Sequence, residues 1–467
     1  MKKFVIFLPV LLALSLLQGC HGGGSGATTQ NTVRLINGTS GSLDMLQSTS
    51  TQTSTKLATA VTYGAASSSV TINSGISTIE LENSGSNTPS FSTSFSFTTA
   101  VDYALLAYTS GQNLRVASFS ENEVAPATGD GKIRIVDLSA DAGSLDVYMA
   151  LQDNTKNDTY TPGTVSAALS ASTALVTGIS GTTSYYELPK NTYHIWVTGA
   201  NDRTDLRLNI PSIVINDQQI LTLVMTSATG GVLLDGLLVT QPLNGVGPVV
   251  AEKNGYARIR IASNFPSTDS ITAASGVSAT SVGNSILSTS VSSTSPLSAY
   301  TLVPVLGTTN AAGTLVPVHT AAATAGNVSV TVLSSINSGT GTATTSYSGS
   351  VTAGADITLL ATGSGSAPTY FPLSDDNTRP AGGYAKLRLV NGNNSSIQLS
   401  YDNVTYATGV ALGTASIPVT LASGGNTNGI TAGGITISPV SFQSQGVYSL
   451  FMLSNSASPY YVLYKDH

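Results

Sequence analysis

One short pattern recurs four times along the chain, and it constrains the fold more than any other feature. Each copy places an arginine between two aliphatic residues, at Arg34, Arg134, Arg260 and Arg388. A second alternating run follows each arginine by 9 or 11 residues, at Leu43, Leu145, Ile271 and Ile397. These two spacings differ by two, so a strand of period two keeps the same face inward in every copy. The pattern predicts four copies of one β unit in series.

The distance between copies indicates whole domains. The arginines recur after 100, 126 and 128 residues, whereas coils of a β-solenoid repeat after about 20–30 residues and propeller blades after about 40–50. Short strands separated by turn residues are typical of sandwiches. We therefore expect an all-β chain of four tandem immunoglobulin-like antiparallel β-sandwich domains. Their predicted ranges are residues 32–124, 130–243, 255–373 and 383–467.

Three finer predictions follow from the strand pattern. Residues 219–239 should form a hairpin that turns at Gly230 and Gly231. The linkers at residues 124–130 and 374–383 carry Pro, Gly and charge, so few contacts should cross them, and residues 128–243 should fold alone. If the two runs of a copy form a hairpin, Arg134 would meet Asp146 on its outer face, as Arg34 would meet Asp44.

The start of the chain indicates export and lipid attachment. A basic start and an apolar stretch that is too short to span a membrane predict a signal peptide at residues 1–19. Leu17-Gln18-Gly19-Cys20 resembles the lipobox of bacterial lipoproteins, which implies cleavage before Cys20 and lipidation of that residue. Cys20 is the chain's one cysteine, so it can form no intrachain disulfide. Residues 20–31 would be a flexible tether. Residue 21 is His rather than Asp, and in Gram-negative lipoproteins this resemblance favours sorting to the outer membrane. We therefore expect an outer-membrane lipoprotein of a Gram-negative bacterium, periplasmic or surface-exposed.

Part of the chain also resembles a known family. The run from Lys132 to Met149, the strand from Tyr193 to Val197 and the predicted hairpin resemble a bacterial envelope family called domain of unknown function 4397. The second copy matches well, the first in its main strands, and the others mostly at the arginine strand and the last hairpin. The resemblance implies a secreted or lipid-anchored protein with an immunoglobulin-like fold. It supplies no activity and no catalytic residue.

The polar residues do not assemble a catalytic or metal centre. The four histidines (His21, His194, His319 and His467) lack the paired spacing of a zinc site. Residues 201–205 and 374–377 place oxygen ligands in loops, which is compatible with calcium, although acidic turns are common without metal. Tyr185-Tyr186 and Tyr460-Tyr461 are the best candidates to stack on sugar rings, and core packing is the simpler interpretation. We expect no catalytic residue, no cofactor and no metal ligand set.

These observations predict where the protein acts better than what it does there. Only 9% of residues are charged, the net charge is −6, and no basic block is present, which argues against nucleic acid as a partner. We expect a lipid-anchored envelope protein with a structural, adhesive or scaffold role and no catalysis. The alternative is a carbohydrate- or peptide-binding module of an uptake or secretion system. The partners would be the membrane, through Cys20, and a glycan or envelope protein.

Overall fold

A computed structural model shows that the chain consists mainly of β-strands. It describes residues 30–48, 54–111, 113–152, 166–242, 247–252, 254–265, 270–278, 291, 296–305, 307–309, 315–317, 325–335, 342–364, 366–426, 428–454 and 459–467. The described strands form four successive sandwiches, each built around its own apolar core. The all-β sandwich fold predicted from the sequence is therefore confirmed. One short helix, α1 (Ala167–Ala171), begins after Ser166, whose hydroxyl accepts a hydrogen bond from the Leu169 backbone N–H.

The first sandwich packs two four-stranded sheets together, in the orders β4-β1-β7-β8 and β3-β2-β5-β6. Alternating apolar residues such as Val33, Leu35 and Leu81 fill the space between the sheets. The strands are β1 (Gln30–Asn37), β2 (Leu43–Ser48), β3 (Ser54–Val61), β4 (Val70–Asn73), β5 (Gly75–Asn83), β6 (Pro89–Phe97), β7 (Tyr103–Ser110) and β8 (Asn113–Ser120). Strand β1 begins within the range predicted as a tether.

The second sandwich has the sheets β12-β9-β15-β16-β17 and β11-β10-β13-β14. The strands are β9 (Asp130–Asp137), β10 (Leu145–Leu151), β11 (Ala174–Ile179), β12 (Tyr186–Pro189), β13 (Asn191–Gly199), β14 (Asp202–Ile215), β15 (Ile220–Ser227), β16 (Leu234–Thr240) and β17 (Val249–Glu252). Strands β15 and β16 pair as the predicted hairpin. Strand β17 pairs with β16, so this domain uses residues between the second and third predicted ranges.

The third sandwich combines the sheets β20-β18-β25-β26 and β19-β23-β24 with the short pair β21-β22. Its strands are β18 (Tyr256–Ser263), β19 (Ser270–Ser278), β20 (Thr301–Pro304), β21 (Gly307–Thr309), β22 (Leu315–Pro317), β23 (Ala325–Ser335), β24 (Thr342–Thr352), β25 (Asp356–Ser364) and β26 (Ala367–Asp375).

The fourth sandwich combines the sheets β30-β27-β36-β37, with β31 also on β27, and β29-β28-β33-β34, with the short pair β32-β35. Its strands are β27 (Tyr384–Gly392), β28 (Ile397–Tyr401), β29 (Val404–Val410), β30 (Thr414–Ala415), β31 (Val419–Ala422), β32 (Gly424–Asn426), β33 (Ile430–Ala432), β34 (Ile435–Ile437), β35 (Val440–Phe442), β36 (Val447–Ser454) and β37 (Pro459–Lys465).

The arginine-bearing strand occupies the same place in every sandwich. It runs parallel to a late strand of its own domain, so that β1 lies beside β7, β9 beside β15, β18 beside β25 and β27 beside β36. The other strand pairs of the described sheets are antiparallel. Strand side chains alternate, so the aliphatic neighbours of each arginine enter the core while the arginine itself lies on the outer face of its sheet.

The predicted hairpin between the two runs of each copy is wrong. Strands β9 and β10 lie in opposite sheets, as do β1 and β2, so Arg134 and Asp146 do not meet. Asp146 instead accepts a hydrogen bond from the Gly178 backbone N–H at 2.8 Å, and Asp44 accepts one from the Ala60 N–H at 2.7 Å. Ala60 and Gly178 have positive φ, where the register of an edge strand shifts. The two aspartates therefore hold bulges in edge strands.

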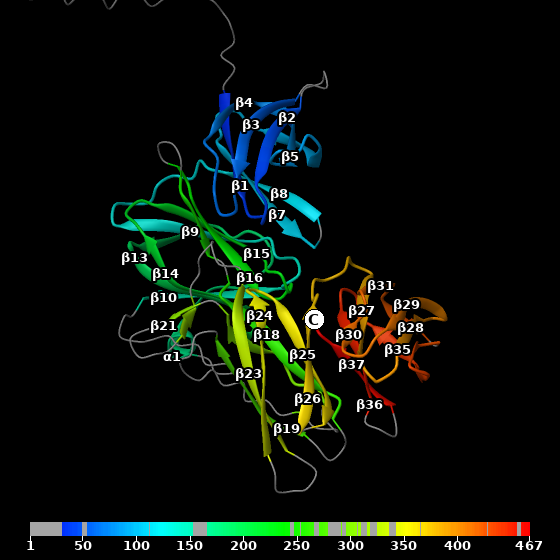
Figure 1. Ribbon diagram of the computed structural model, residues 1–467. Coiled ribbons are helices and arrows are strands. Elements are labelled where there is room, and N and C mark those ends of the chain that lie inside the picture. Colours follow the sequence, from blue (N-terminus) through cyan, green and yellow to red (C-terminus); the bar gives the residue numbers. More distant parts are fainter. Residues whose placement is uncertain are drawn as a thin grey trace, which may run out of the picture.

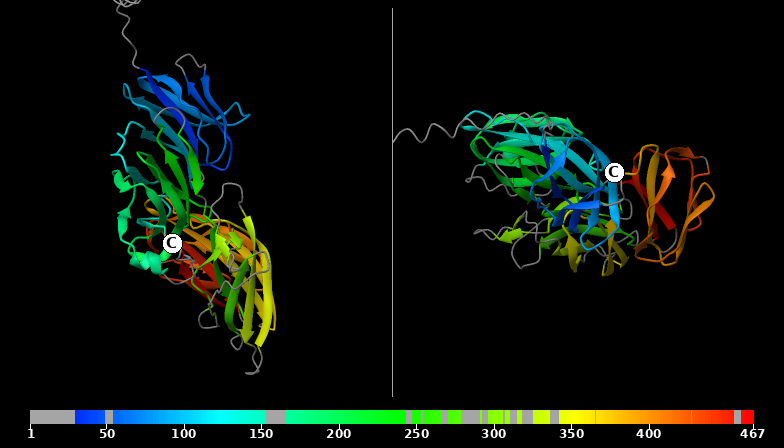
Figure 2. Two further views of the ribbon diagram at one scale, coloured as in Figure 1. Left: turned by 90° about the vertical axis from the view of Figure 1, so that its left-hand side faces the viewer. Right: turned by 90° about the horizontal axis from the view of Figure 1, so that it is seen from above.

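The four sandwiches form a bent array (Figure 1). The first, in blue, lies above the second and third, and the fourth, in orange and red, lies beside the third. Figure 2 shows the same sideways position of the fourth domain from above. Apolar clusters span all three junctions between successive domains. The prediction that few contacts cross the linkers is therefore wrong.

Candidate functional site

The outer faces of the arginine-bearing sheets are the surfaces through which the domains pair. At the first junction, Ile36 and Leu106 of the first domain pack against Val136, Val224 and Leu237 of the second. At the third junction, Ala262 and Leu360 of the third domain pack against Val390, Phe451 and Leu453 of the fourth. In both cases two arginine-bearing sheets meet face to face. All four recurring arginines therefore lie in or beside a junction between domains.

Arg34 joins the first domain to the second. Its side chain is fully buried, and its Nε donates to Glu121 Oε2 at 2.9 Å. Its other nitrogens donate to the backbone oxygens of Gly247 and Thr240 in the second domain, at 2.6 and 2.8 Å. Burial raises the pKa of Glu121, although the neighbouring Arg34 opposes the rise. The pair therefore neutralises two charges that would be costly to bury separately.

Arg134 belongs to the same junction and is only half-buried. Its Nε donates to the hydroxyl of Thr222 on β15 at 2.9 Å. Its guanidinium lies 5.4 Å from the ring centre of Phe119 in the first domain and 4.9 Å from that of Tyr185. These contacts are cation–π interactions. Among the described residues, Arg134 thus contacts rings, a hydroxyl and a backbone carbonyl, and it bonds no carboxylate.

Arg260 and Arg388 form the charged centre of the third junction. Arg260 donates to Asp466 and lies 3.4 Å from Asp375, while Arg388 donates to the other oxygen of Asp375. Attraction to Tyr300, Asp466 and Asp375 raises the pKa of Arg260 even though burial opposes the rise. Two buried cations thus share two buried carboxylates across the junction.

Aromatic rings surround this charged centre. The guanidinium of Arg260 lies 4.4 Å from the ring centre of Tyr300, 5.0 Å from Phe451 and 5.4 Å from Tyr464. Thr358 and Tyr300 also donate hydrogen bonds to Asp375. The rings keep water away, which strengthens the ion pairs and makes an unpaired charge there more costly.

The first and third junctions place some of their arginine contacts at corresponding positions. Arg34 bonds Glu121 and the end of β16, as Arg260 contacts Asp375 and the residue after β37. Arg134 donates to the Ser120 carbonyl at 3.5 Å, as Arg388 donates to the Ser374 carbonyl at 3.0 Å. The repeating unit is therefore a pair of sandwiches, and the chain contains two such pairs.

The segment from Ser374 to Pro380 connects three domains rather than serving as a free linker. The Asn377 side chain donates to Asp356 of the third domain at 2.6 Å, and its backbone N–H donates to the Gly230 carbonyl of the second at 3.1 Å. The Arg379 backbone N–H donates to Asp141 of the second domain at 2.9 Å. His467 contacts the Asn377 carbonyl from the fourth domain at 3.0 Å. The contacts of this connecting segment fix the second pair of sandwiches against the first.

Close approach of the backbones at the second junction requires glycine. A Cβ on Gly231, which has a φ of +88°, would lie 2.6 Å from the Thr378 backbone nitrogen. A Cβ on Gly230 would lie 2.6 Å from the backbone nitrogen of Asp356. The β15–β16 turn therefore fits against the third domain and the connecting segment because it has no side chain there.

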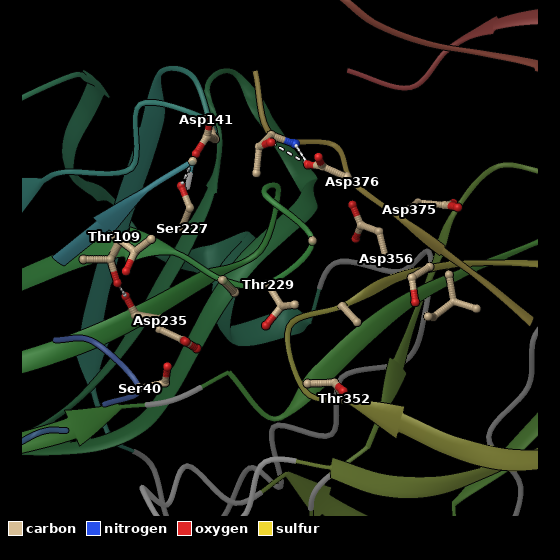
Figure 3. Close-up of a pocket in the computed structure, with 18 of the residues that line it drawn as sticks. Ser40, Thr109, Asp141, Ser227, Thr229, Asp235, Thr352, Asp356, Asp375 and Asp376 are labelled. Atoms are coloured by element: carbon tan, nitrogen blue, oxygen red, sulfur yellow. Dashed lines mark hydrogen bonds between the residues drawn. The ribbon is translucent and has the colours of Figure 1, made fainter. Parts of the chain in front are cut away.

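An acidic cleft of about 550 Å³ opens where the first three domains and the connecting segment meet (Figure 3). Hydroxyl side chains and five aspartates line it: Asp141, Asp235, Asp356, Asp375 and Asp376. The described lining contains no lysine or arginine. Burial raises the pKa of Asp356 to about 6, although Arg258 and Asn377 oppose the rise. The Asp141 carboxylate accepts hydrogen bonds from Ser227 and from the Arg379 backbone, so this carboxylate also connects segments.

The two loops considered for calcium direct their carboxylates at protein donors. Asp202 accepts from Thr204, and Asp205 pairs with Arg207. Asp375 is engaged at the third junction, and Asp376 pairs with Lys386 at 3.0 Å. Within the described residues, no group of three or more His, Cys, Asp and Glu side chains is arranged to hold a metal ion.

The tyrosine and histidine candidates lie mostly in packing positions. Tyr185 faces Arg134, Tyr186 packs against the second core, and Tyr461 is 41% exposed, while the side chain of Tyr460 lies outside the described residues. His194 stacks on Trp196 with ring centres 3.9 Å apart and bonds Asn209. Cys20, His21 and His319 also lie outside the described residues. No helix in the described part of the chain has the length and apolarity to cross a membrane.

The acceptors of the arginines are the functional residues that the sequence pattern missed. Thr222, Thr358 and Ser449 recur beside Arg134, Arg260 and Arg388 on the parallel strand. A serine followed by an acidic residue recurs at the end of the last strand pair of the first and third domains only, as Ser120-Glu121 and Ser374-Asp375. Comparison of the first copy with the third, instead of all four together, would have found them.

Comparisons with known proteins agree with part of this description. Residues 31–148 match the family model described as Domain of unknown function (DUF4397), a range that covers the first sandwich and reaches into β10. A search of the curated proteins gave no match. Among solved structures, a candidate cell adhesion protein from Bacteroides fragilis is similar, at 11% identity over 56% of this chain and 86% of that chain. Its TM-score of 0.16 is too low to support an argument about fold or function. The resemblance predicted from the sequence is confirmed for residues 31–148, which match the model of the family called domain of unknown function 4397.

Proposed function

We propose that this protein is a structural and adhesive scaffold of the bacterial envelope, in which two fixed pairs of sandwiches present a surface at a distance from the membrane. The observation that carries the proposal is the buried character of the junctions. Arg34 and Arg260 are fully buried between domains, and apolar clusters span all three junctions. Extensive apolar interfaces restrict relative domain motion. Such an array transmits position and force, as a scaffold requires.

The anchor completes the proposal. The resemblance of residues 17–20 to a lipobox supports lipid attachment at Cys20, at the outer membrane of a Gram-negative bacterium. One acyl chain holds a protein only marginally, whereas the several chains of a mature lipoprotein together give stable attachment. We propose no catalytic step.

Two measurements test this function. Small-angle scattering of the purified chain should fit the bent array of Figure 1 as one rigid shape. Cys20→Ser should move the protein from the membrane fraction to the soluble fraction without lowering its unfolding temperature. A scattering curve that requires freely moving domains would overturn the scaffold, and membrane retention of Cys20→Ser would overturn the anchor.

A second candidate function is a carbohydrate- or peptide-binding module of an uptake or secretion system. The cleft lined by hydroxyl groups and aspartates favours it, because several domains converge there. Protease treatment of whole cells distinguishes display on the surface, where the protein is cut, from a periplasmic position, where it is protected.

A further inference from the structure

A second open cavity, of about 430 Å³, lies where the first two sandwiches meet the connecting segment. Tyr108 lines it from the first domain, Asp137, Ser144 and Ser180 from the second, and Arg379 from the connecting segment. Its volume is within the range of small-molecule sites. The cavity exists only because the junctions bring these distant segments together.

Arg379 is the one cation of this described lining, and its guanidinium forms no ion pair with a carboxylate of the described residues. Its Nη2 contacts His467 Nε2 at 3.2 Å, and its backbone N–H donates to Asp141. Its Nε is buried, and neither Nε nor Nη1 donates to an acceptor in the described chain. Burial and repulsion from Arg207 lower the pKa of Arg379, although Asp141 opposes this. An anion at the guanidinium would relieve both effects.

The imidazole of His467 offers Arg379 no negative charge. Burial lowers the pKa of His467 to about 3, so the imidazole is neutral near pH 7. A neutral ring with its proton on Nδ1 can donate to the Asn377 carbonyl and accept from Arg379 at Nε2. The guanidinium therefore keeps its full charge toward the cavity.

Asp137 gives the cavity a second kind of recognition group. Its Oδ1 accepts both hydrogen bonds from Ser139, while its Oδ2 accepts none from the described residues. Burial raises the pKa of Asp137 to about 6, against the two Ser139 hydrogen bonds. The group is thus mostly ionised at neutral pH and can accept hydrogen bonds from hydroxyl groups. The exposed hydroxyls of Ser144 and Ser180 can donate or accept beside it.

We propose that this cavity binds a carboxylated sugar, such as a hexuronic acid residue of an anionic polysaccharide. The ligand's carboxylate pairs with Arg379, and its ring hydroxyls donate to Asp137 and bond Ser144 and Ser180. A neutral sugar would leave the guanidinium without a counter-ion. An acidic peptide would bring further carboxylates toward Asp137 and Asp141, which repel them. The mixed set of one cation, one carboxylate and several hydroxyls matches a sugar acid best.

This inference deepens the adhesive part of the proposed function, since it names what the scaffold would hold. Its failure is distinguishable from failure of the scaffold, because scattering and membrane fractionation do not depend on ligand. If the array is rigid and anchored but binds no sugar acid, only the present inference falls.

The test is calorimetric titration of the full-length protein with an oligomer of galacturonic acid. A galactose oligomer of the same length and a short polyglutamate peptide are the comparison ligands. We expect the galacturonate oligomer to bind, more weakly at high salt, and the other two to bind at least about tenfold more weakly, as expected when a charge-assisted hydrogen bond is missing or repulsion is added. Equal binding of the neutral oligomer, or tighter binding of the peptide, would overturn the inference.

Three variants test the residues. Arg379→Gln should weaken galacturonate binding at least about tenfold. Lys190→Gln, which changes an exposed lysine beyond the opposite end of β9 from Asp137, should leave it unchanged. Because Arg379 also contacts other segments, its loss could disturb the fold. Ser180→Tyr fills the cavity from an exposed position instead, so it should abolish binding while the urea unfolding midpoint stays the same. Wild-type affinity in folded Ser180→Tyr would overturn the site.

Discussion

The first and third junctions place their arginines on the same strands, yet they give those arginines different acceptors. Arg34 meets one carboxylate and two backbone carbonyls, and its neighbour Arg134 meets rings and a hydroxyl. Arg260 and Arg388, in contrast, share Asp375, and Arg260 also holds Asp466. The position of a recurring arginine is thus inherited with the fold, while its partners are set by each pair of domains.

This contrast predicts that the two junctions differ in how strongly a substitution destabilises them. The apolar cluster of the first junction contains more buried residues than that of the third. Apolar contacts lose strength in proportion to the area removed, whereas a buried ion pair that loses one partner leaves a charge in a low dielectric. The third junction should therefore be the more sensitive to a single substitution.

The largest effect should come from removing a whole partner domain. A fragment of residues 128–243, which the sequence alone predicts to fold by itself, lacks β17 and exposes Val136, Val224 and Leu237. We expect it to aggregate or unfold without cooperativity, while a fragment of residues 30–252 melts cooperatively. Calorimetry and sedimentation check this. Equal unfolding midpoints for the two fragments would show that the first junction contributes little.

Arg260→Ala should give the largest effect of a single charge removal. The substitution removes the arginine hydrogen bond from Asp466, which keeps that of Ser449, and removes one cation from Asp375, both in a buried setting. The expected loss in the free energy of unfolding is about 3–5 kcal/mol. Arg34→Ala should cost less, about 2–3 kcal/mol, because it leaves one carboxylate and two neutral carbonyls unsatisfied.

Urea unfolding of both variants of the full chain measures the difference. Arg115→Ala serves as the control, since this arginine is exposed and should change stability by no more than about 0.5 kcal/mol. A larger loss for Arg34→Ala than for Arg260→Ala would reverse the comparison.

The next largest effect should be a change in the free energy of unfolding with pH. Burial raises the pKa of Glu252, on β17 beside the first junction, from 4.5 to about 7. The folded state therefore holds this proton more tightly than the unfolded state. The resulting stability is fully present below about pH 4.5 and is lost as the pH rises through 7. We expect the free energy of unfolding to be larger near pH 5 than near pH 8, by up to about 3 kcal/mol from this group.

Glu252→Gln tests the origin of this pH dependence, because an amide does not titrate. The difference in urea midpoint between the two pH values should shrink in the variant. Asp137 and Asp356, whose pKa values burial raises to about 6, should retain the remainder. An unchanged pH profile in Glu252→Gln would mean that another group governs it.

The smallest effect should be at Arg134. It is half-buried and bonds no carboxylate in the described chain, so Arg134→Ala should cost about 1 kcal/mol. Leu145→Ala, in the fully buried core of the same domain, should cost about 2–5 kcal/mol. Urea melts of the two variants compare the core with the edge of the junction. A larger loss for Arg134→Ala would mean that the junction stabilises the second domain more than its own core does.

Much of the fold follows from local periodicity. The alternation around Arg134 places Ile133 and Ile135 inward, and both are fully buried in the second core. The same alternation places Leu145 inward from the opposite sheet. Period-two patterns specify the face of a strand well because one face must leave water. They do not specify the partner strand, which is why the β9–β10 hairpin was predicted wrongly.

The junctions could not be predicted in the same way. Arg34 meets Glu121 across 87 residues, and Arg260 meets Asp466 across 206. An arginine on an outer strand face looks exposed in sequence, because nothing local shows that a second domain covers it. The connecting segment was likewise predicted to be a simple linker, since Pro, Gly and charge are also what such a crowded crossing requires.

The parallel pairing of the arginine strands also fixes an order of events during folding. Val33 lies beside Tyr103, and Ile259 beside Ile357, so each first strand keeps one edge open until a late strand arrives. Non-local pairings of this kind slow folding, because a long loop must close before they form. The partner of Arg260 becomes available later still, because Asp466 follows almost the whole fourth domain in the chain. Because the chain is synthesised from the N-terminus, the first pair of sandwiches can form while the second is still incomplete. Nascent chains should therefore fold pair by pair.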